Sequence, residues 1–217
     1  QMQQTSLSSG STNIRIQGLD GRYTQLLRDG FPLYGGFSSG LSILQIPPLD
    51  LQQFEIIKGS SSTLYGGGAI AGLVNMVSKT PDEEPALDIM LTQTQALGST
   101  ANVFYSKRNE KFGVSLYGSG HYQKAYDPED DGFSNLPKTT SISFNPKLFY
   151  YPSDKTTLWF GLNGTYDDRI GGDITKIESG ENGIHQYTEE NNSKRLSSQF
   201  VYQTQLDSVS SLQFKNS

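Results

Sequence analysis

The stretch that most restricts the fold runs from Phe54 to Lys79 and reads FEIIKGSSSTLYGGGAIAGLVNMVSK. Short apolar strands are predicted over 54–57 and 73–77, and Gly59 ends the first of them. Between the two strands, glycines occupy positions 66, 67, 68 and 72. Because glycine lacks a Cβ atom, it permits positive φ angles and the close approach of another backbone. The stretch therefore predicts two strands joined through a crowded, glycine-dependent crossing, not a flexible linker.

Residues 66–71 also fit the G-x-G-x-x-G/A pattern of dinucleotide-binding proteins. That pattern needs a strand directly before it and a helix directly after it, so that the phosphate meets the N-terminus of the helix. Here the strand at 54–57 ends several residues too early, and the residues after Gly72 have no helical periodicity. We therefore interpret these glycines as part of the backbone crossing.

The composition favours a β-rich protein whose strands have one polar face. The 217 residues include 23 Gly, 12 Tyr and 11 Phe, but only 34% are hydrophobic, and the mean hydropathy is -0.49. No run of about 18 apolar residues is present, so the sequence contains no membrane-spanning helix. Any membrane span must then be a closed β-barrel, since that is the other structure that satisfies all backbone groups in lipid.

Charge and side-chain chemistry exclude several classes of function. A net charge of -5 argues against a nucleic-acid surface, which needs clustered Lys and Arg. The chain has no cysteine and two histidines, His121 and His185, so neither a thiolate site nor a zinc site is expected. No nucleophile and base share a readable spacing, and we expect neither an enzyme nor a cofactor. The first residues lack the features of an export signal, so we expect a mature protein or a fragment.

The residues before the linker are predicted to form short extended pieces. A half-buried strand is expected over 13–18, and Asp29-Gly30 is a hairpin turn signal between 25–28 and 31–33. A loop is expected over 34–41, either a flexible surface loop or one that contacts ligand. A helical turn is expected over 49–53. Two prolines around three acids then make 80–85 a domain boundary.

From residue 86 onward the pattern predicts long antiparallel strands. Six strands are expected, at about 86–96, 101–107, 112–123, 140–151, 156–167 and 194–206, followed by a seventh that the chain end cuts off. After the first strand pair, their connections alternate between tight turns and long loops, as in transmembrane barrels. Lys147, the clearest charge in the middle of a strand, shares its parity with Ser143 and Asn145, so it should point into a wet interior.

The loop at 127–132 begins like a calcium-binding loop, with acids at 127, 129 and 131 and then Gly132. The closing glutamate of that motif would stand at 138, where the chain has Lys138. A solvated acidic loop is the better interpretation, and the sequence leaves calcium open.

The glycine-rich stretch resembles the closing part of the plug domain of TonB-dependent outer-membrane receptors. Fourteen positions agree with the family pattern without a gap: Glu55, Lys58, Gly59, Ser61, Ser62, Leu64, Tyr65, Gly66, Gly68, Ala69, Ile70, Gly72, Asn75 and Lys79. The departures are Gln52-Gln53, Ser60, Gly67 and Ala71. Residues 13–33 resemble an earlier part of the plug, although Arg28 stands where an apolar residue is usual.

The resemblance implies a mainly β fold: a mixed α/β plug segment over 1–79, a linker over 80–85, and the first antiparallel strands of a 22-stranded transmembrane β-barrel over 86–217. It also implies a location in the outer membrane of a Gram-negative bacterium, in contact with lipid. The implied function is active uptake of a scarce ligand such as an iron-siderophore, haem or cobalamin. The implied partner is TonB, which acts through a box that this chain does not contain.

The resemblance also suggests which side chains carry function. In such receptors, apical plug loops bind the small-molecule ligand, such as a metal chelate, and the large side chains able to do so here are Arg22, Tyr23, Tyr34 and Phe37. Glu55 and Lys58 are predicted to form ion pairs between the plug and the barrel. The alternative function is that of a soluble β-rich ligand- or carbohydrate-binding module, which the detergent dependence of the complete protein would distinguish.

Overall fold

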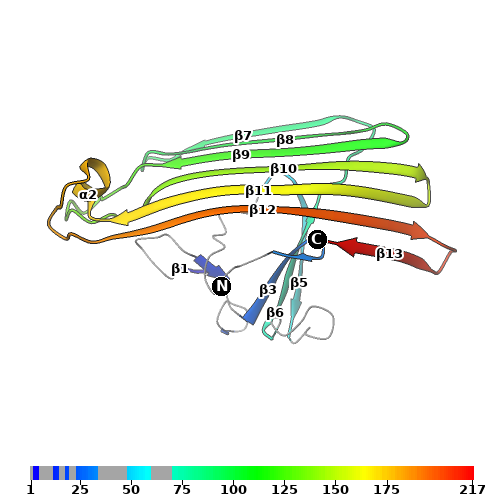
Figure 1. Cartoon of the computed structure of the whole chain (residues 1–217), viewed down its shortest axis with the longest axis horizontal. Helices are drawn as coiled ribbons and strands as arrows, with labels where there is room; N and C mark the ends of the chain where they lie inside the picture. Colours follow the sequence, from blue (N-terminus) through cyan, green and yellow to red (C-terminus); the bar gives the residue numbers. More distant parts are fainter. Residues whose placement is uncertain (1, 5–11, 15–17, 20–22, 34–47, 60–69) are drawn as a thin grey trace.

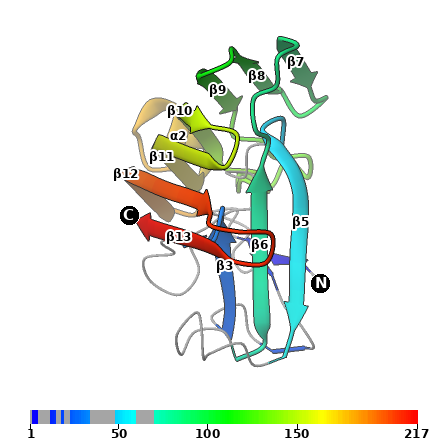
Figure 2. The same ribbon diagram turned by 90° about the vertical axis from the view of Figure 1, so that its right-hand side faces the viewer.

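The computed structural model describes residues 2–4, 12–14, 18–19, 23–33, 48–59 and 70–217 (Figure 1). Two sheets dominate it. A long curved sheet, here called the wall, contains the C-terminal strands, and a smaller sheet, here called the inner sheet, lies on the concave side of the wall (Figures 1 and 2). A separate antiparallel pair joins β1 (Met2–Gln4) to β2 (Thr12–Ile14). Within the described ranges, no helix is long and apolar enough to cross a membrane.

The wall has seven strands, and each pairs antiparallel with its neighbour in sequence. The strands are β7 (Ala86–Gln93), β8 (Gly98–Arg108), β9 (Phe112–Gln123), β10 (Lys138–Ser153), β11 (Thr156–Gly172), β12 (Thr188–Gln205) and β13 (Ser211–Asn216). This is the predicted meander. The strands β10, β11 and β12 are longer than the prediction because their pairing continues into the expected loops, as far as Gly172 opposite Thr188.

The connections between wall strands differ at the two ends of the sheet. Tight turns join β8 to β9, β10 to β11 and β12 to β13, and all three lie at one end. The long connections 124–137 and 173–187 lie at the other end, and the second contains α2 (Ile174–Ser179) (Figure 1). In membrane barrels the short turns face the periplasm and the long loops face outward.

The two faces of the wall have opposite chemistry. Exposed apolar side chains cover the convex face, among them Leu87, Ile89, Leu91, Phe112, Ile142, Phe144, Leu148 and Phe160. Polar and charged side chains on the other face are buried, among them Asn102, Ser106, Ser115, Asn145, Lys147 and Gln199. The predicted alternation is therefore confirmed: the apolar side chains point away from the inner sheet.

The inner sheet has the strand order β4-β3-β6-β5. Its strands are β3 (Thr24–Arg28), β4 (Phe31–Pro32), β5 (Leu51–Lys58) and β6 (Gly72–Ser78). The strands β3 and β6 are parallel, and the other two pairs are antiparallel. Asp29 and Gly30 have φ angles of 54° and 79° and form the predicted hairpin turn. The small core of the sheet includes Leu27, Leu73 and Met76.

Two local predictions can be compared with the described residues. The helical turn over 49–53 is wrong, because β5 begins at Leu51, and Leu51 pairs with Ser78 of β6. This pairing satisfies backbone groups that a single helical turn would leave open. The crowded crossing is confirmed at Gly72, where φ is 141° and a Cβ atom would lie 2.3 Å from the carbonyl oxygen of Ile57. Positions 66–68 lie outside the described residues.

Candidate functional site

The inner sheet contacts the wall through a buried polar cluster centred on Lys147. The Nζ atom of Lys147 donates to Oδ2 of Asp29 at 2.5 Å and to Oγ of Ser78 at 2.7 Å. Asp29 lies in the β3–β4 turn and also accepts from the backbone N–H and the hydroxyl of Ser78, both at 2.8 Å. Lys147 is only 4% exposed. One wall side chain is therefore bonded to two elements of the inner sheet.

A second ion pair lies beside the first. Arg28, at the end of β3, forms a salt bridge with Asp50, and both side chains are buried. The Asn145 amide, oriented so that both of its ends are satisfied, accepts from Nη1 of Arg28 at 3.0 Å. Asn145 and Lys147 lie on the same face of β10, so this strand contributes one neutral and one charged group to the cluster.

The four charged groups of the cluster sum to zero, which is what a buried site requires. Burial raises the pKa of Asp29, but the Lys147 ammonium and the bonds from Ser78 outweigh burial and hold that pKa below its ordinary value. Burial also raises the pKa of Asp50. The charges of Arg28 and Lys147 lower that pKa but do not fully offset burial, so it stays above its ordinary value. Asp29 is therefore the better stabilised anion of the two.

Aromatic side chains and a second lysine surround the tip of the β3–β4 hairpin. The ring of Phe31 meets the ring of Trp159 edge-on at 6.1 Å, and Nζ of Lys147 lies 4.9 Å from the Trp159 ring. From β13, Nζ of Lys215 donates to the backbone oxygen of Asp29 at 3.0 Å. The hairpin tip is thus held by β10, β11 and β13.

The connecting segment 79–85 makes a further contact with the wall. Lys79 forms a salt bridge with Asp88 at 2.9 Å and lies 4.9 Å from the ring of Phe104. The N–H of Arg108 donates to the carbonyl of Asp82 at 2.7 Å. The linker predicted over 80–85 therefore runs along the wall where β8 ends.

Glu55 lines a cavity that Asp29, Ser78 and Lys147 also line, whereas Lys58 does not line it. Both are exposed on β5, the edge strand of the inner sheet. The Glu55 carboxylate accepts from the side-chain amides of Asn75 at 2.8 Å and Gln53 at 3.0 Å. Within the described part of the chain, neither Glu55 nor Lys58 forms a salt bridge with β7–β13. Their predicted ion pairs with the wall stay a prediction.

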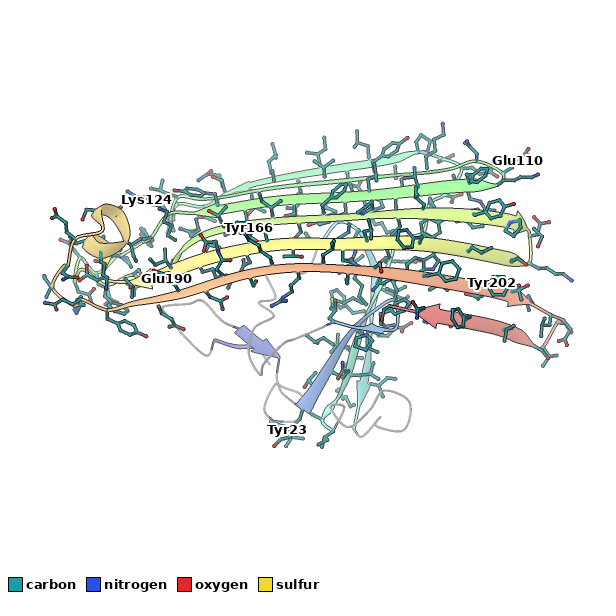
Figure 3. All side chains as sticks on the ribbon, viewed as in Figure 1. Tyr23, Glu110, Lys124, Tyr166, Glu190 and Tyr202 are labelled. Atoms are coloured by element: carbon teal, nitrogen blue, oxygen red, sulfur yellow. The ribbon has the colours of Figure 1, made fainter. Side chains whose placement is uncertain are left out.

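Of the four predicted ligand-binding residues, the structure describes Tyr23. Its half-buried side chain packs against Ala71 and Val74, and its carbonyl accepts from the N–H of Ala71 at 2.9 Å. Figure 3 shows Tyr23 at the end of the inner sheet remote from the wall. Arg22, Tyr34 and Phe37 lie outside the described residues, so ligand binding by this group stays a prediction.

The acids of the 127–132 loop bond to their own backbone. Asp127 accepts from the N–H groups of Glu129 at 3.1 Å and Gly132 at 2.8 Å, and Asp131 accepts from that of Phe133 at 2.9 Å. Within the described ranges, no three His, Cys, Asp or Glu side chains are grouped to hold a metal ion.

Asp173 orders the second of the two long loops. This residue caps α2 by accepting from the N–H of Lys176 at 3.0 Å, and it also accepts from the N–H groups of His185 at 2.8 Å and Gln186 at 3.1 Å. These backbone donors, that of Lys176 first, hold the pKa of Asp173 below its ordinary value. The His185 ring meets Phe133 edge-on at 5.4 Å, which joins the second loop to the first.

A wall with an apolar convex face and an inner sheet held on its polar face defines a membrane β-barrel with an internal plug. Residues 1–73 match the family model described as the TonB-dependent Receptor Plug Domain. This part of the chain therefore matches the plug domain of the TonB-dependent receptors, and the chain as a whole resembles outer-membrane receptors of Gram-negative bacteria. This family consists of receptors and transporters, not enzymes.

Similar proteins agree with this assignment. The "Iron-regulated outer membrane virulence protein" of Vibrio cholerae serotype O1 is 30% identical over 154 residues, which is 63% of this chain and 24% of that protein. A ferric enterobactin receptor, PfeA, of Pseudomonas aeruginosa has a TM-score of 0.66 at 16% identity, covering 92% of this chain and 34% of that one. The ferric-catecholate import receptor Fiu of E. coli has a TM-score of 0.68 at 14% identity, covering 97% and 30%. The chain thus spans about a quarter to a third of these relatives.

The residues of the buried cluster were not predicted as a site. Two of them were singled out: Arg28, where an apolar residue is usual, and Lys147, a charge in mid-strand. A charge in each of two buried strands needs a partner of opposite sign. That signal could have shown that both cations need acidic partners, and Asp29 follows Arg28 directly, but the sequence does not show that Asp50 is the partner of Arg28.

Proposed function

We propose that this chain is the plug segment and the first wall strands of a receptor that actively imports an iron-siderophore across the outer membrane. The observation that carries the proposal is the polar contact between the inner sheet and the wall, centred on Lys147, Asp29 and Ser78. Water can replace hydrogen bonds and ion pairs at a small net free-energy cost, whereas separating an apolar interface exposes its whole area. A plug held in this way can be rearranged by a modest force.

The choice of ligand class is supported by the relatives. The Vibrio cholerae protein is named as iron-regulated, and the PfeA and Fiu structures are of receptors for ferric chelates. We further propose that Arg22, Tyr23, Tyr34 and Phe37 contact the ligand. TonB would supply the force from the periplasm by binding the receptor on the N-terminal side of the plug.

Uptake of radiolabelled iron by cells that express the complete receptor and lack other siderophore receptors tests the proposal. We expect accumulation of iron presented as a catecholate siderophore, and we expect it to be lost in cells without TonB. The variant Lys58→Ala should transport more slowly, because it removes the proposed ion pair between Lys58 and a carboxylate of the wall. Unchanged uptake would remove Lys58 from the mechanism. Growth on haem or cobalamin alone, with no siderophore uptake, would replace the proposed ligand class.

The soluble binding module is not favoured by any described feature. Leu87, Ile89 and Leu91 are each more than 60% exposed on the convex face of β7, which is an unusual surface for a protein in water. Solubility of the complete protein without detergent would reverse this conclusion.

A further inference from the structure

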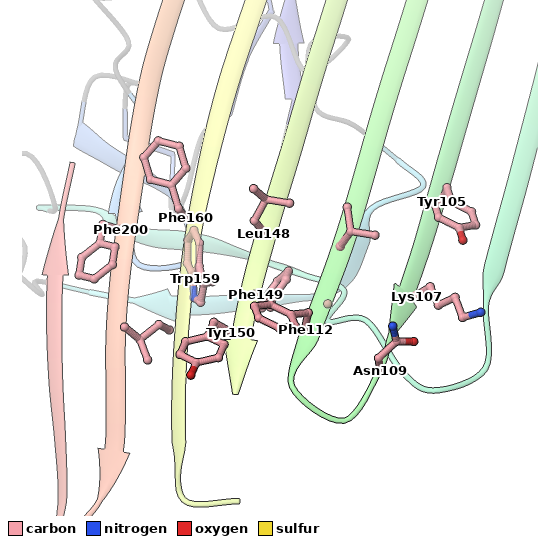
Figure 4. Close-up of a pocket in the computed structure, with 13 residues that line it drawn as sticks. Tyr105, Lys107, Asn109, Phe112, Leu148, Phe149, Tyr150, Trp159, Phe160 and Phe200 are labelled. Atoms are coloured by element: carbon pink, nitrogen blue, oxygen red, sulfur yellow. The ribbon is translucent and has the colours of Figure 1, made fainter. Parts of the chain in front are cut away.

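The convex face of the wall contains a groove next to its tight turns. The groove has a volume of about 600 Å3 and crosses β8 to β12. Its lining is mostly aromatic and aliphatic and includes Tyr105, Phe112, Leu148, Phe160 and Phe200. Figure 4 shows these side chains together with Lys107 and Asn109, which lie at the end beside the β8–β9 turn.

The pairing of the strands places the groove side chains in a row. Lys107 lies opposite Val114, Val114 opposite Leu148, Leu148 opposite Phe160, and Phe160 opposite Phe200. Directly opposite residues share one face of a sheet, so the row carries a cation at one end and apolar side chains along the rest. Beside this row the rings of Phe112 and Tyr150 stack with centroids 5.1 Å apart, and they form one side of the groove.

Lys107 places a positive charge on the convex face, whose other groove side chains are mostly apolar. It is exposed, and within the described residues its ammonium forms no salt bridge with a carboxylate. A lysine on the lipid face is costly at the membrane midplane but costs only about 0–1 kcal/mol near the interface. Its long stem lets the ammonium reach the polar headgroups while the methylenes stay on apolar surface. The cation is thus available to an anion at headgroup depth.

We propose that this groove binds one glycerophospholipid of the periplasmic leaflet. An acyl chain lies along Val114, Leu148 and Phe160, and the phosphate is held by the Lys107 ammonium and the Asn109 amide. The occupant is a lipid because the groove combines a long apolar surface with a single cation at one end, which matches the chemistry of an acyl chain joined to a phosphate. The row from Lys107 to Phe200 lies on the opposite face of the wall from Lys147, although Phe149 and Trp159 also line the groove, and the site does not depend on which ligand the receptor imports.

Native mass spectrometry of the complete receptor in a mild detergent, titrated with phosphatidylglycerol, tests the proposal. We expect one phosphatidylglycerol to bind more tightly than the others. Lys107→Gln should weaken that binding about five-fold, because a Lys near an anionic lipid surface contributes on the order of 1 kcal/mol. Lys107→Arg should retain it. The matched control is Lys155→Gln, which removes an exposed lysine from the neighbouring β10–β11 turn and should bind as the wild type does.

Variants that fill the groove test whether it binds the acyl chain of the lipid. Leu148→Trp should abolish the tight binding, and Val114→Phe should reduce it if the first variant does not fold. Glycerol phosphate, which has the phosphate without acyl chains, should not compete. Equal binding by Lys107→Gln and wild type, equal losses in Lys107→Gln and Lys155→Gln, or full competition by glycerol phosphate would each overturn the proposal. None of these measurements involves siderophore uptake, so their failure is separate from failure of the proposed function.

Discussion

Replacing Lys147 by methionine removes the wall ammonium that is bonded to the Asp29 carboxylate. The methionine keeps a similar length and points toward the inner sheet, so the lipid face of β10 is unchanged. The Lys147 side chain is 5% exposed and its partner Asp29 is 13% exposed, so water cannot readily replace the lost ammonium. The inner sheet should therefore be held less firmly against the wall.

The expected loss of free energy follows from what remains around Asp29. Removing one partner of a buried ion pair costs about 3–5 kcal/mol, because it leaves an uncompensated charge. Asp29 keeps the two hydrogen bonds from Ser78, which places the expected cost near the lower limit. Since each 1.4 kcal/mol is a factor of ten in an equilibrium constant, a cost of about 3 kcal/mol should raise the population of the detached inner sheet by roughly 100-fold.

Hydrogen exchange in the complete receptor measures this population, because amides exchange when their region opens. In Lys147→Met, peptides covering 24–32 and 72–78 should exchange roughly 100-fold faster, while β8 and β9 stay protected. Lys155→Met, on an exposed turn, is the control and should behave as the wild type does. The double variant Asp29→Asn with Lys147→Met should recover most of the protection, because it leaves no unpaired charge. If Lys147→Met exchanges no faster than the control, the buried pair does not hold the inner sheet.

Three further changes test other parts of the structure. Gly72→Ala should destabilise the β5–β6 pair by at least about 1–3 kcal/mol, because the φ angle of residue 72 is positive and the added Cβ would meet the carbonyl of Ile57. Faster hydrogen exchange of the β6 amides would report this loss. The control is Gly118→Ala, which should change little because no atom lies within 4 Å of the added Cβ. Phe144→Arg places a charge on the lipid face near the middle of β10 and should lower the free energy of unfolding, measured in urea, by about 2–4 kcal/mol. Ser119→Arg, on the inner face, should not lower it. Equal losses in the two variants would contradict the assignment of faces. Acid should release the loop at 173–187: the pKa of Asp173 is lowered in the folded loop, so its stabilisation is present above the ordinary value of 3.8 and is lost as the pH falls through the lowered pKa. Proteolysis of this loop by an acid-active protease should therefore be slower in the wild type than in Asp173→Ala above about pH 4, and the two rates should converge below it. A ratio of the two rates that does not change with pH would contradict the capping role.

Much of the fold follows from local pattern. The alternation along β9 and β10 placed Phe112, Leu148 and Phe144 on one face and Lys147 on the other, because successive side chains of a strand point to opposite sides. The Asp29-Gly30 signal identified the hairpin, because few other residues tolerate two positive φ angles in a row. The start of β5 at Leu51 was missed, since pairing with the distant Ser78 decides it and local propensity does not.

The candidate site was harder to predict from the sequence than the fold was. Glu55 and Lys58 were predicted as ion-pair partners from the resemblance to a family, and the structure places them on the edge strand of the inner sheet. The pairs that do join the inner sheet to this wall link residues far apart in sequence, such as Asp29 and Lys147, which are separated by 118 positions. Nothing in the spacing of two such residues shows that they meet.

By itself, the sequence determined a glycine-dependent crossing between two short strands, a following series of long amphipathic strands, and the inward orientation of Lys147. These features depend on periodicity and backbone freedom, which are properties of neighbouring residues. Only the tertiary structure decided that Lys147 binds Asp29 and Ser78, that Arg28 is neutralised by Asp50, and that Lys107 ends an apolar groove. The reason is physical: a buried charge must find a partner, but which partner it finds depends on how two separately formed sheets are placed against each other.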